Sequence, residues 1–405
     1  MMARPTGTEK PARTALYRSV GAELAHYDVD VKSPTLVKRD AVMLPANVQY
    51  VWPHPSRQYL YVASSEGGPA SSGAKGDKHF VSALRVDTST GALRLHGEPQ
   101  RLSTRPIHIC LDATGTYALI AYNNPSGVTV HRINADGTIG MEVKQPQPLD
   151  TGIFAHQVLV TPSNRMVILV TRGNDAAGDK AEDPGALKLF QFKDGVLTNL
   201  ASVAPGGGYG FGPRHLDFHP TRPWVYASIE RQNKLHVYQL QPDGLSREPV
   251  FARNTLAGPL VEKTRQLAGA IHIHPNGKFV YVSNRADTTM EFDGRRVFRG
   301  GENSIAVYSI DQTTGEPTLI QHADPRGFHV RTFAIDPSGR MLVAASLIPL
   351  SVREGSRVVT VPAGLAVFRI TDDGKLDFVR KYDVDTGGKN QFWMGIVGLT
   401  PAVRA

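Results

Sequence analysis

The sequence predicts an all-β protein, a single seven-bladed β-propeller with four antiparallel strands in each blade. Three observations support this prediction. A hairpin phrase recurs six times, several copies are followed by a further strand that ends at an Asp-Gly turn, and strand-like segments remain at both chain ends. Four short strands in each repeat of about 50 residues, with no helical periodicity between them, are typical of a propeller blade.

The recurring phrase consists of a short apolar strand, a turn built on Pro or Gly, and a stronger apolar strand. Proline presets the backbone angle φ that a tight turn needs, and Gly or Asn tolerates a positive φ, so each phrase predicts a hairpin. One residue of each turn serves as an anchor for counting. The six anchors are Pro55, Ala113, Pro162, Pro220, Pro275 and Pro337.

Six complete repeats span about residues 47–385. The segments Glu23–Val29 and Gln391–Val397 also have strand character. Together the two ends would supply the seventh blade, which closes the ring and removes an open sheet edge. The repeat alone is also compatible with six or eight blades. We predict a flexible N-terminal extension over residues 1–15 and one propeller domain over residues 16–405.

The net charge of +8 favours an anionic partner. Lys and Arg form no long run, so a pocket for a phosphate or carboxylate group of a small molecule is expected rather than nucleic-acid binding. Cys110 is the single cysteine, which excludes a disulfide within the chain. No apolar stretch predicts a leader or a membrane span. These features favour a cytoplasmic location, or a periplasmic one if a leader was removed, and they leave the oligomeric state open.

Two positions in each repeat carry most of the polar candidates. The residue six before the anchor lies on the first strand, which lines the channel of a propeller, and the residue ten after it ends the next strand. The two should face each other across antiparallel strands, at the end away from the turn. The pairs are Gln49 and Ser65, Ile107 and Asn123, His156 and Arg172, Arg214 and Glu230, Gly269 and Arg285, and Arg331 and Leu347.

Long loops are expected at this same end of the channel. They are Gly173–Gly185, Ala286–Asn303 and Ile348–Gly364, joined by the glycine-rich segment Gly206–Gly212. One face should therefore be polar, basic and rich in loops, and the turn face should be plain. A channel mouth with converging charges is the expected binding site. The acidic residues of the first loop lack the spacing of a calcium loop, so we predict a solvated loop and no metal site.

Three phrases, Gly212–Pro220, Tyr281–Arg285 and Phe333–Gly339, resemble the propeller lactonase family. That family includes bacterial 6-phosphogluconolactonases and the carboxymuconate lactonizing enzymes, and the resemblance covers about residues 45–385. It implies a lactonase that hydrolyses a small anionic sugar lactone, with 6-phosphogluconolactone as the family default and no cofactor. It also implies that His156, Arg214, Glu230 and Arg285 are the catalytic residues.

Opening a lactone requires a group that activates water and positive charge that stabilises the developing oxyanion. His156 is the candidate base, because imidazole titrates near neutral pH. Arg214 and Arg285 are candidate anion clamps, and Glu230 would orient a partner or act as an acid. A structural ion pair between Arg214 and Glu230 is an equally good interpretation. Arg285 faces Gly269, which has no side chain, so the charge of Arg285 is predicted to be available.

The remaining candidates are expected to contact substrate. Arg172 faces His156 and should lower the pKa of that histidine. The other substrate-binding candidates are His108, His215, Arg331 and Asn123. His54, His219 and His274 belong to the turns on the opposite face, so we interpret them as structural.

Two other functions remain open. In the last repeat, Leu347 stands where relatives often carry a polar residue, and the loops after Arg172, Arg285 and Leu347 are long. Both features leave room for a carboxymuconate-type cycloisomerase, which closes or reopens a lactone without net hydrolysis. A non-enzymatic propeller that binds a ligand or a protein is the third possibility, because fold does not determine function.

Overall fold

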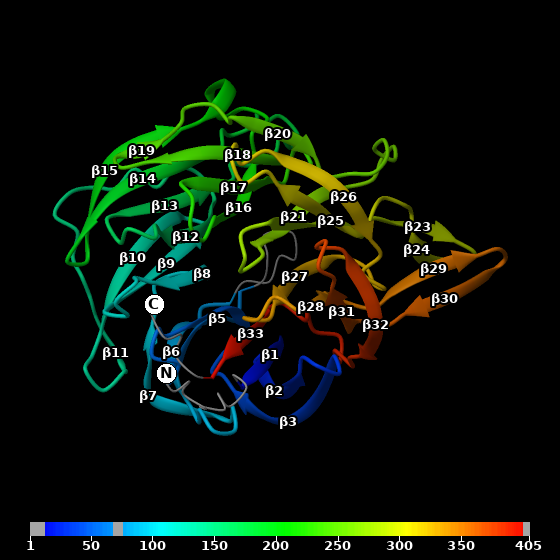
Figure 1. Ribbon diagram of the computed structural model, residues 1–405, viewed down its shortest axis with the longest axis horizontal. Coiled ribbons are helices and arrows are strands. Elements are labelled where there is room, and N and C mark those ends of the chain that lie inside the picture. Colours follow the sequence, from blue (N-terminus) through cyan, green and yellow to red (C-terminus); the bar gives the residue numbers. More distant parts are fainter. Residues whose placement is uncertain (1–12, 68–75, 400–405) are drawn as a thin grey trace, which may run out of the picture.

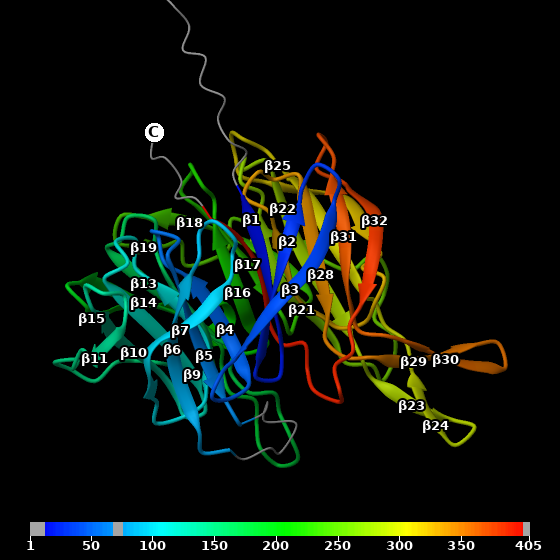
Figure 2. The same ribbon diagram turned by 90° about the horizontal axis from the view of Figure 1, so that it is seen from below.

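The computed structural model describes residues 13–67 and 76–399 and arranges them as seven β-sheets around a central channel (Figure 1). Each sheet is one blade, and its innermost strand lines the channel. Figure 2 shows the ring from the side, with the strands running between its two faces. The predicted seven-bladed propeller is confirmed.

Blade 1 is built from both ends of the chain. Its strand order is β3-β2-β1-β33, and the C-terminal strand β33 is the innermost. The strands are β1 (Thr14–Val20), β2 (Glu23–Asp30), β3 (Thr35–Met43) and β33 (Met394–Gly398). The N-terminal segment thus supplies three strands, where the sequence indicated one. β1 begins inside the segment expected to be a flexible extension, and residues 1–12 lie outside the described residues.

Blades 2 to 4 follow in chain order, each with its first strand innermost. Blade 2 consists of β4 (Val48–Pro53), β5 (Tyr59–Ser65), β6 (His79–Val86) and β7 (Leu93–Arg101). Blade 3 consists of β8 (Pro106–Leu111), β9 (Tyr117–Asn123), β10 (Ser126–Ile133) and β11 (Ile139–Glu142). Blade 4 consists of β12 (Ala155–Val160), β13 (Met166–Thr171), β14 (Ala186–Lys193) and β15 (Val196–Val203).

Blades 5 to 7 follow the same plan with additions at their edges. Blade 5 consists of β16 (Pro213–Phe218), β17 (Trp224–Ile229), β18 (Lys234–Gln241), β19 (Gly244–Leu245) and β20 (Phe251–Asn254). Blade 6 consists of β21 (Gln266–Ile273), β22 (Phe279–Ala286), β25 (Ser304–Ile310) and β26 (Pro317–Ala323). Blade 7 consists of β27 (Val330–Ile335), β28 (Met341–Ser346), β31 (Gly364–Ile370) and β32 (Leu376–Asp383).

Two of the three expected long loops contain hairpins instead. β23 (Thr289–Phe292) pairs with β24 (Arg295–Phe298), and β29 (Leu350–Glu354) pairs with β30 (Arg357–Val361). β24 contacts β29, and the two hairpins project together beyond the ring (Figures 1 and 2). In the described part of the chain the one helix is the short 3₁₀ turn η2 (Pro205–Gly208). The described residues contain no helix with the length and apolarity that a membrane span requires.

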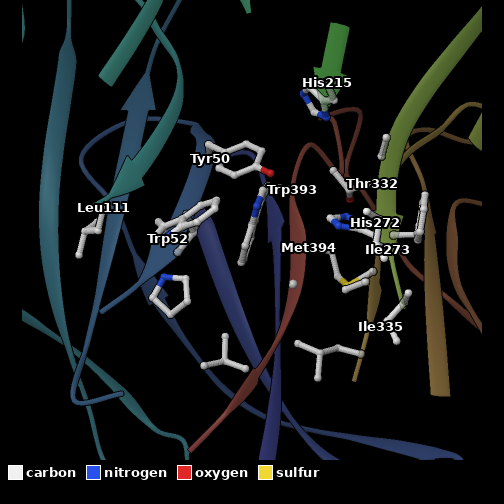
Figure 3. A pocket seen from close by; sticks show the side chains of 18 of the residues that line it. Tyr50, Trp52, Leu111, His215, His272, Ile273, Thr332, Ile335, Trp393 and Met394 are labelled. Carbon is white, nitrogen blue, oxygen red and sulfur yellow. The ribbon is translucent and has the colours of Figure 1, made fainter. Parts of the chain in front are cut away.

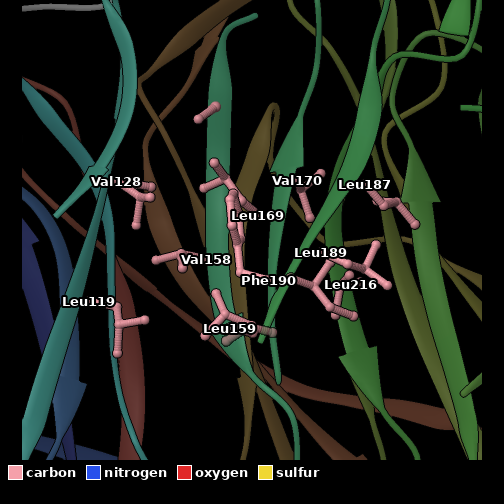
Figure 4. Close-up of a cluster of buried hydrophobic side chains, with 14 of the residues drawn as sticks. Leu119, Val128, Val158, Leu159, Leu169, Val170, Leu187, Leu189, Phe190 and Leu216 are labelled. Atoms are coloured by element: carbon pink, nitrogen blue, oxygen red, sulfur yellow. The ribbon is translucent and has the colours of Figure 1, made fainter. Parts of the chain in front are cut away.

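The core lies between neighbouring blades. Each strand presents alternate side chains to the two faces of its sheet, and both faces are covered in a propeller, so the inner strands are apolar on both sides. In Figure 4, Leu119 and Val128 of blade 3 approach Val158 and Phe190 of blade 4. Further along the same cluster, Leu216 of blade 5 closes the other side.

Histidines of the turn face connect one blade to the next. The Nε2 atoms of His54, His219 and His274 lie 3.2, 2.9 and 2.7 Å from carbonyl oxygens of turn glycines in the following blades. The first of these glycines, Gly115, has a φ of +74°, and a Cβ there would lie 2.2 Å from the His54 ring. Only glycine satisfies both conditions. These histidines are structural, as the sequence indicated.

Candidate active site

A β-bulge interrupts six of the innermost strands at the position predicted to line the channel. The register between first and second strands shifts around His156, Arg214 and Arg331, and around the equivalent residues of the other three blades. A bulge leaves one residue unpaired and redirects its side chain. The predicted direct pairing is therefore wrong, by one residue on the turn side of the bulge and by two residues beyond it, where the extra residue shifts the register again. His215, for example, pairs with Ser228, and Pro213 pairs with Ile229.

The bulges and strand ends nevertheless bring three of the candidate arginines together around the carboxylate of a fourth candidate, Glu230. Glu230 follows the last residue of β17, and its Oε1 lies 2.7 Å from Nε of Arg172. Its Oε2 lies 2.8 Å from Nε of Arg214 and 2.7 Å from an amino nitrogen of Arg285. Arg214, Arg285 and Glu230 are only 1%, 3% and 5% exposed. We call these four residues the arginine cluster.

Arg285 is paired, contrary to the prediction that its charge would be available. Its backbone pairs with Leu267, but its side chain crosses the inner strand of its own blade to reach Glu230 of blade 5. Gly269 makes this crossing possible, since a Cβ there would lie 2.8 Å from Nε of Arg285. The missing side chain thus provides space for the guanidinium and does not leave the charge unpaired.

The cluster carries more positive than negative charge. Burial alone would raise the pKa of Glu230, but Arg285, Arg172 and Arg214 together hold it well below its usual range. Burial and the neighbouring Arg285 lower the pKa of Arg214 to about 9. A guanidinium keeps its proton in a protein. The lowered pKa therefore reflects buried positive charge that one carboxylate does not balance, and a bound anion would offset it.

Two further arginines extend this charge along the channel. Arg331 places its guanidinium 3.6 Å from the ring centre of Phe392, and burial together with Arg214 and Arg285 lowers the pKa of Arg331 well below its usual value. Arg105, which the sequence analysis did not single out, donates a 2.6 Å hydrogen bond to Gln49. Neither of them forms an ion pair with a carboxylate among the described residues.

Three histidines lie beside the cluster. The ring of His156 is 5.1 Å from that of His215, which is 6.1 Å from that of His108. Burial, and next to it Arg214, lowers the pKa of His156 well below 6.5, so its imidazole is neutral at pH 7. Its Nδ1 is buried without a hydrogen-bond partner among the described residues. A neutral imidazole with a free nitrogen can accept a proton.

The other predicted contacts differ in their surroundings. Arg172, expected to act on His156, instead bonds to Glu230 and, at 2.8 Å, to Asp175. His108 has no exposed surface and packs against Tyr50 with ring centres 3.9 Å apart and the rings tilted by 39°, so it supports the channel wall. Asn123 is buried at the end of β9, in blade 3.

Asp287 and His329 form a pair that the sequence analysis missed. Nδ1 of His329 lies 2.9 Å from a carboxylate oxygen of Asp287, and its Nε2 faces the Arg285 guanidinium at 3.3 Å. His329 lies eight residues before its anchor, and Asp287 lies twelve after its own. These positions are each two residues beyond the predicted rings, so the period of two along a strand could have revealed them.

The acidic loop between Gly173 and Gly185 is tied to the site and is not simply solvated, as the sequence suggested. Asp175 lies 2.8 Å from Nε of Arg231, and Glu182 pairs with the same guanidinium. Glu182 also accepts a hydrogen bond from the backbone NH of Gly210. Arg231 directly follows Glu230, so one arginine fastens both the acidic loop and the neighbouring glycine-rich segment next to the cluster.

Replacing Arg231 by Ala is expected to release the loop at 173–185. Loss of two charge-assisted contacts should raise amide hydrogen exchange in that loop about tenfold or more, because each such contact contributes about 1.5–3 kcal/mol. The strands of blade 4 should exchange as before. Lys180→Ala is the matched control, since Lys180 pairs with Asp183 in the same loop but is 62% exposed. Equal exchange in both variants would contradict the role of Arg231.

The channel also contains a cavity on the other face. It has a volume of about 540 Å³ and is lined by the later residues of the inner strands, from His215 to the turn residues Pro55 and Pro275. The sequence analysis expected the turn face to be plain, and the cavity shows that this expectation was wrong. Tyr50 and His215 lie at the inner end of this cavity, next to His108 and His156, the other two histidines beside the cluster.

Seven blades closed into a ring, with a buried arginine cluster beside the central channel, define the class of this protein as a β-propeller. Residues 13–347 match the family described as "Lactonase, 7-bladed beta-propeller". The chain therefore belongs to this lactonase family, and the resemblance stated from the sequence is confirmed.

Curated relatives and solved structures agree with this assignment. The chain is 24% identical over 340 residues to a 6-phosphogluconolactonase of Bacillus subtilis, covering 82% of this chain and 86% of the relative. It is 29% identical over 310 residues to a 6-phosphogluconolactonase of Pectobacterium carotovorum, covering 75% and 79%. A periplasmic gluconolactonase of Pseudomonas aeruginosa shares the fold, with a TM-score of 0.70 at 18% identity, covering 96% of this chain and 99% of that one.

Proposed function

We propose that this chain hydrolyses a small anionic sugar lactone of the 6-phosphogluconolactone type at the arginine cluster. The observation that supports the proposal most is the charge of the cluster, in which three buried guanidinium groups share the carboxylate of Glu230. A phosphate or carboxylate on the substrate would offset the remaining positive charge. The names of the curated relatives support the same substrate class.

The proposed chemistry assigns one role to each residue. His156 takes a proton from water as the oxygen of that water attacks the lactone carbonyl. Arg214 and Arg285 stabilise the negative charge that develops on the carbonyl oxygen or hold the anionic group of the substrate. When the ring C–O bond breaks, the imidazolium of His156 returns the proton to the leaving oxygen. Glu230 positions the arginines, and Arg331 extends the positive surface toward the substrate.

Access to the cluster requires movement, because its side chains are more than nine-tenths buried. The loop at 173–185 is held to Arg172 and Arg231 through Asp175. We infer that the opening of this loop precedes substrate binding.

The decisive comparison uses two lactones that differ only in phosphate. We expect kcat/KM for 6-phosphogluconolactone to exceed that for unphosphorylated gluconolactone by about a hundredfold, since two charge-assisted hydrogen bonds are worth about 3 kcal/mol or more. The preference should shrink as salt is added, because exposed charges are screened during the approach of the substrate.

Isotopically labelled water distinguishes the reaction type. Hydrolysis places the label in the product carboxylate. Equal rates with both lactones, or rates no faster than spontaneous opening, would overturn the proposal. An isomer without label, formed from a carboxymuconate-type substrate, would support the cycloisomerase instead.

A further inference from the structure

The cavity on the turn face is separate from the proposed lactonase site. It occupies the other half of the channel and opens between the turns of the blades, near Pro55 and Pro275. Its volume of about 540 Å³ lies within the range of pockets for small organic molecules, about 300–1,000 Å³. His215 and Tyr50 lie at its inner end, between the cavity and His156.

The walls of the cavity are largely aromatic and aliphatic. In Figure 3, Trp52 and Trp393 lie on one side, and Met394 and Ile335 lie on the other. One edge of the Trp393 indole packs against Gly395, where a Cβ would lie 2.7 Å from the ring. Apolar surface of this kind that remains in contact with water favours an apolar partner.

A few polar groups point to the character of that partner. Thr332 lines the cavity, and its buried hydroxyl has no hydrogen-bond partner among the described residues. A buried hydroxyl without a partner is costly, and a ligand could satisfy it. His272 also lines the wall, with its side chain 39% exposed, and its partly buried position lowers its pKa, so it is neutral at pH 7 and can exchange a hydrogen bond.

Charge is confined to the rim. Among the lining residues, Arg57 and Asp112 are the charged side chains, and both belong to turns. The carboxylate of Asp112 is already occupied by the backbone NH groups of Thr116 and Tyr117. Next to the wall, the carboxylate of Asp217 lies 3.9 Å from Nδ1 of His272, but it already accepts hydrogen bonds from the backbone NH groups of Phe218 and Ile273. A charged ligand would therefore find little free counter-charge inside, whereas the arginine cluster offers one.

We propose that this cavity binds a neutral aromatic molecule that carries a hydroxyl or carbonyl group, independently of the lactone site. The ring lies between the indoles and the aliphatic wall, and the polar group hydrogen-bonds to Thr332. This inference does not depend on the proposed lactonase activity, because the two ligands differ in charge and occupy opposite halves of the channel.

The test uses 4-nitrobenzyl alcohol, a neutral aromatic alcohol whose nitro group quenches indole fluorescence. Calorimetry should give a dissociation constant of about 1 mM or tighter. Tryptophan emission should fall on binding, because two of the three tryptophans, Trp52 and Trp393, line the cavity. Trp224 lies in the core between blades, so Trp224→Phe should leave the fractional quenching at least as large.

Two variants and one competitor locate the bound probe. Ala334→Phe enlarges a residue that lines the cavity and also packs in the core between blades 7 and 1, so it should abolish binding in a variant whose fold is checked by circular dichroism. Thr332→Val keeps the volume but removes the hydroxyl, and should weaken binding about three- to tenfold. Saturating inorganic phosphate, which would occupy the arginine cluster, should leave the affinity unchanged. Absence of heat and quenching at 10 mM, unchanged affinity in both variants, or displacement by phosphate would each overturn the proposal.

Discussion

Replacement of Glu230 by Gln is expected to lower the free energy of unfolding by about 3 kcal/mol or more and to abolish lactone hydrolysis. The substitution keeps the size of the side chain but removes the one carboxylate shared by Arg172, Arg214 and Arg285. Removal of one partner from a buried ion pair costs about 3–5 kcal/mol, because the opposite charges stay buried without compensation. Denaturant unfolding and a lactone assay measure the two effects.

The control is a surface ion pair of the same length. Asp28 lies 2.7 Å from Arg39, whose side chain is 54% exposed. Asp28→Asn should cost less than about 1 kcal/mol, because water screens an exposed pair. If Glu230→Gln proves as mild as this control, the arginine cluster does not depend on Glu230 for its stability.

The effect of Glu230→Gln should also depend on pH in a defined direction. The pKa of Glu230 is lower in the folded chain than the usual value of 4.5. A carboxylate with a lowered pKa contributes its full stability above the unfolded value and loses it as the pH falls through the folded value. The difference in unfolding free energy between the wild type and the variant should therefore be constant at pH values well above 4.5, decline progressively as the pH falls below 4.5, and level off once the pH is below the folded pKa.

Replacement of His156 by Asn is expected to lower kcat by a factor of about 10² to 10⁴ while the fold survives, if His156 is the general base. The amide cannot accept a proton from water at neutral pH. Circular dichroism and thermal unfolding check the fold, and initial hydrolysis rates check the activity.

His329→Gln serves as the matched comparison, because His329 is the other buried histidine that approaches Arg285. It should lose much less activity than His156→Asn. A larger loss in His329→Gln would transfer the role of base to the pair of His329 and Asp287.

The pH dependence of the rate gives an independent check on His156. Burial and Arg214 lower the pKa of His156 well below 6.5. A base with a lowered pKa remains unprotonated to a lower pH, so the wild-type kcat should be the same at pH 7 and pH 6 and should fall only in more acidic solution. A rate that halves at pH 6.5 would contradict this assignment.

The sequence predicted the blades well, because turn residues and alternating strands are local patterns that occur in every repeat. Counting from the anchors also reached His156, Arg214, Glu230 and Arg285, which the structure brings to one place. Counting failed at the register, because a bulge adds one residue to the inner strand without a distinct local signal. Counting also missed Asp287 and His329, because they lie two residues beyond the counted positions, just outside β22 and β27.

The sequence by itself determined the ring, the closure of blade 1 by both chain ends, and the excess of positive charge. Only the tertiary structure decided that Arg285 crosses Gly269 to reach a glutamate of another blade, and that an aromatic cavity occupies the opposite half of the channel. The physical reason is that strands and turns follow from neighbours in the chain, whereas ion pairs and cavities depend on how separate blades meet around the axis.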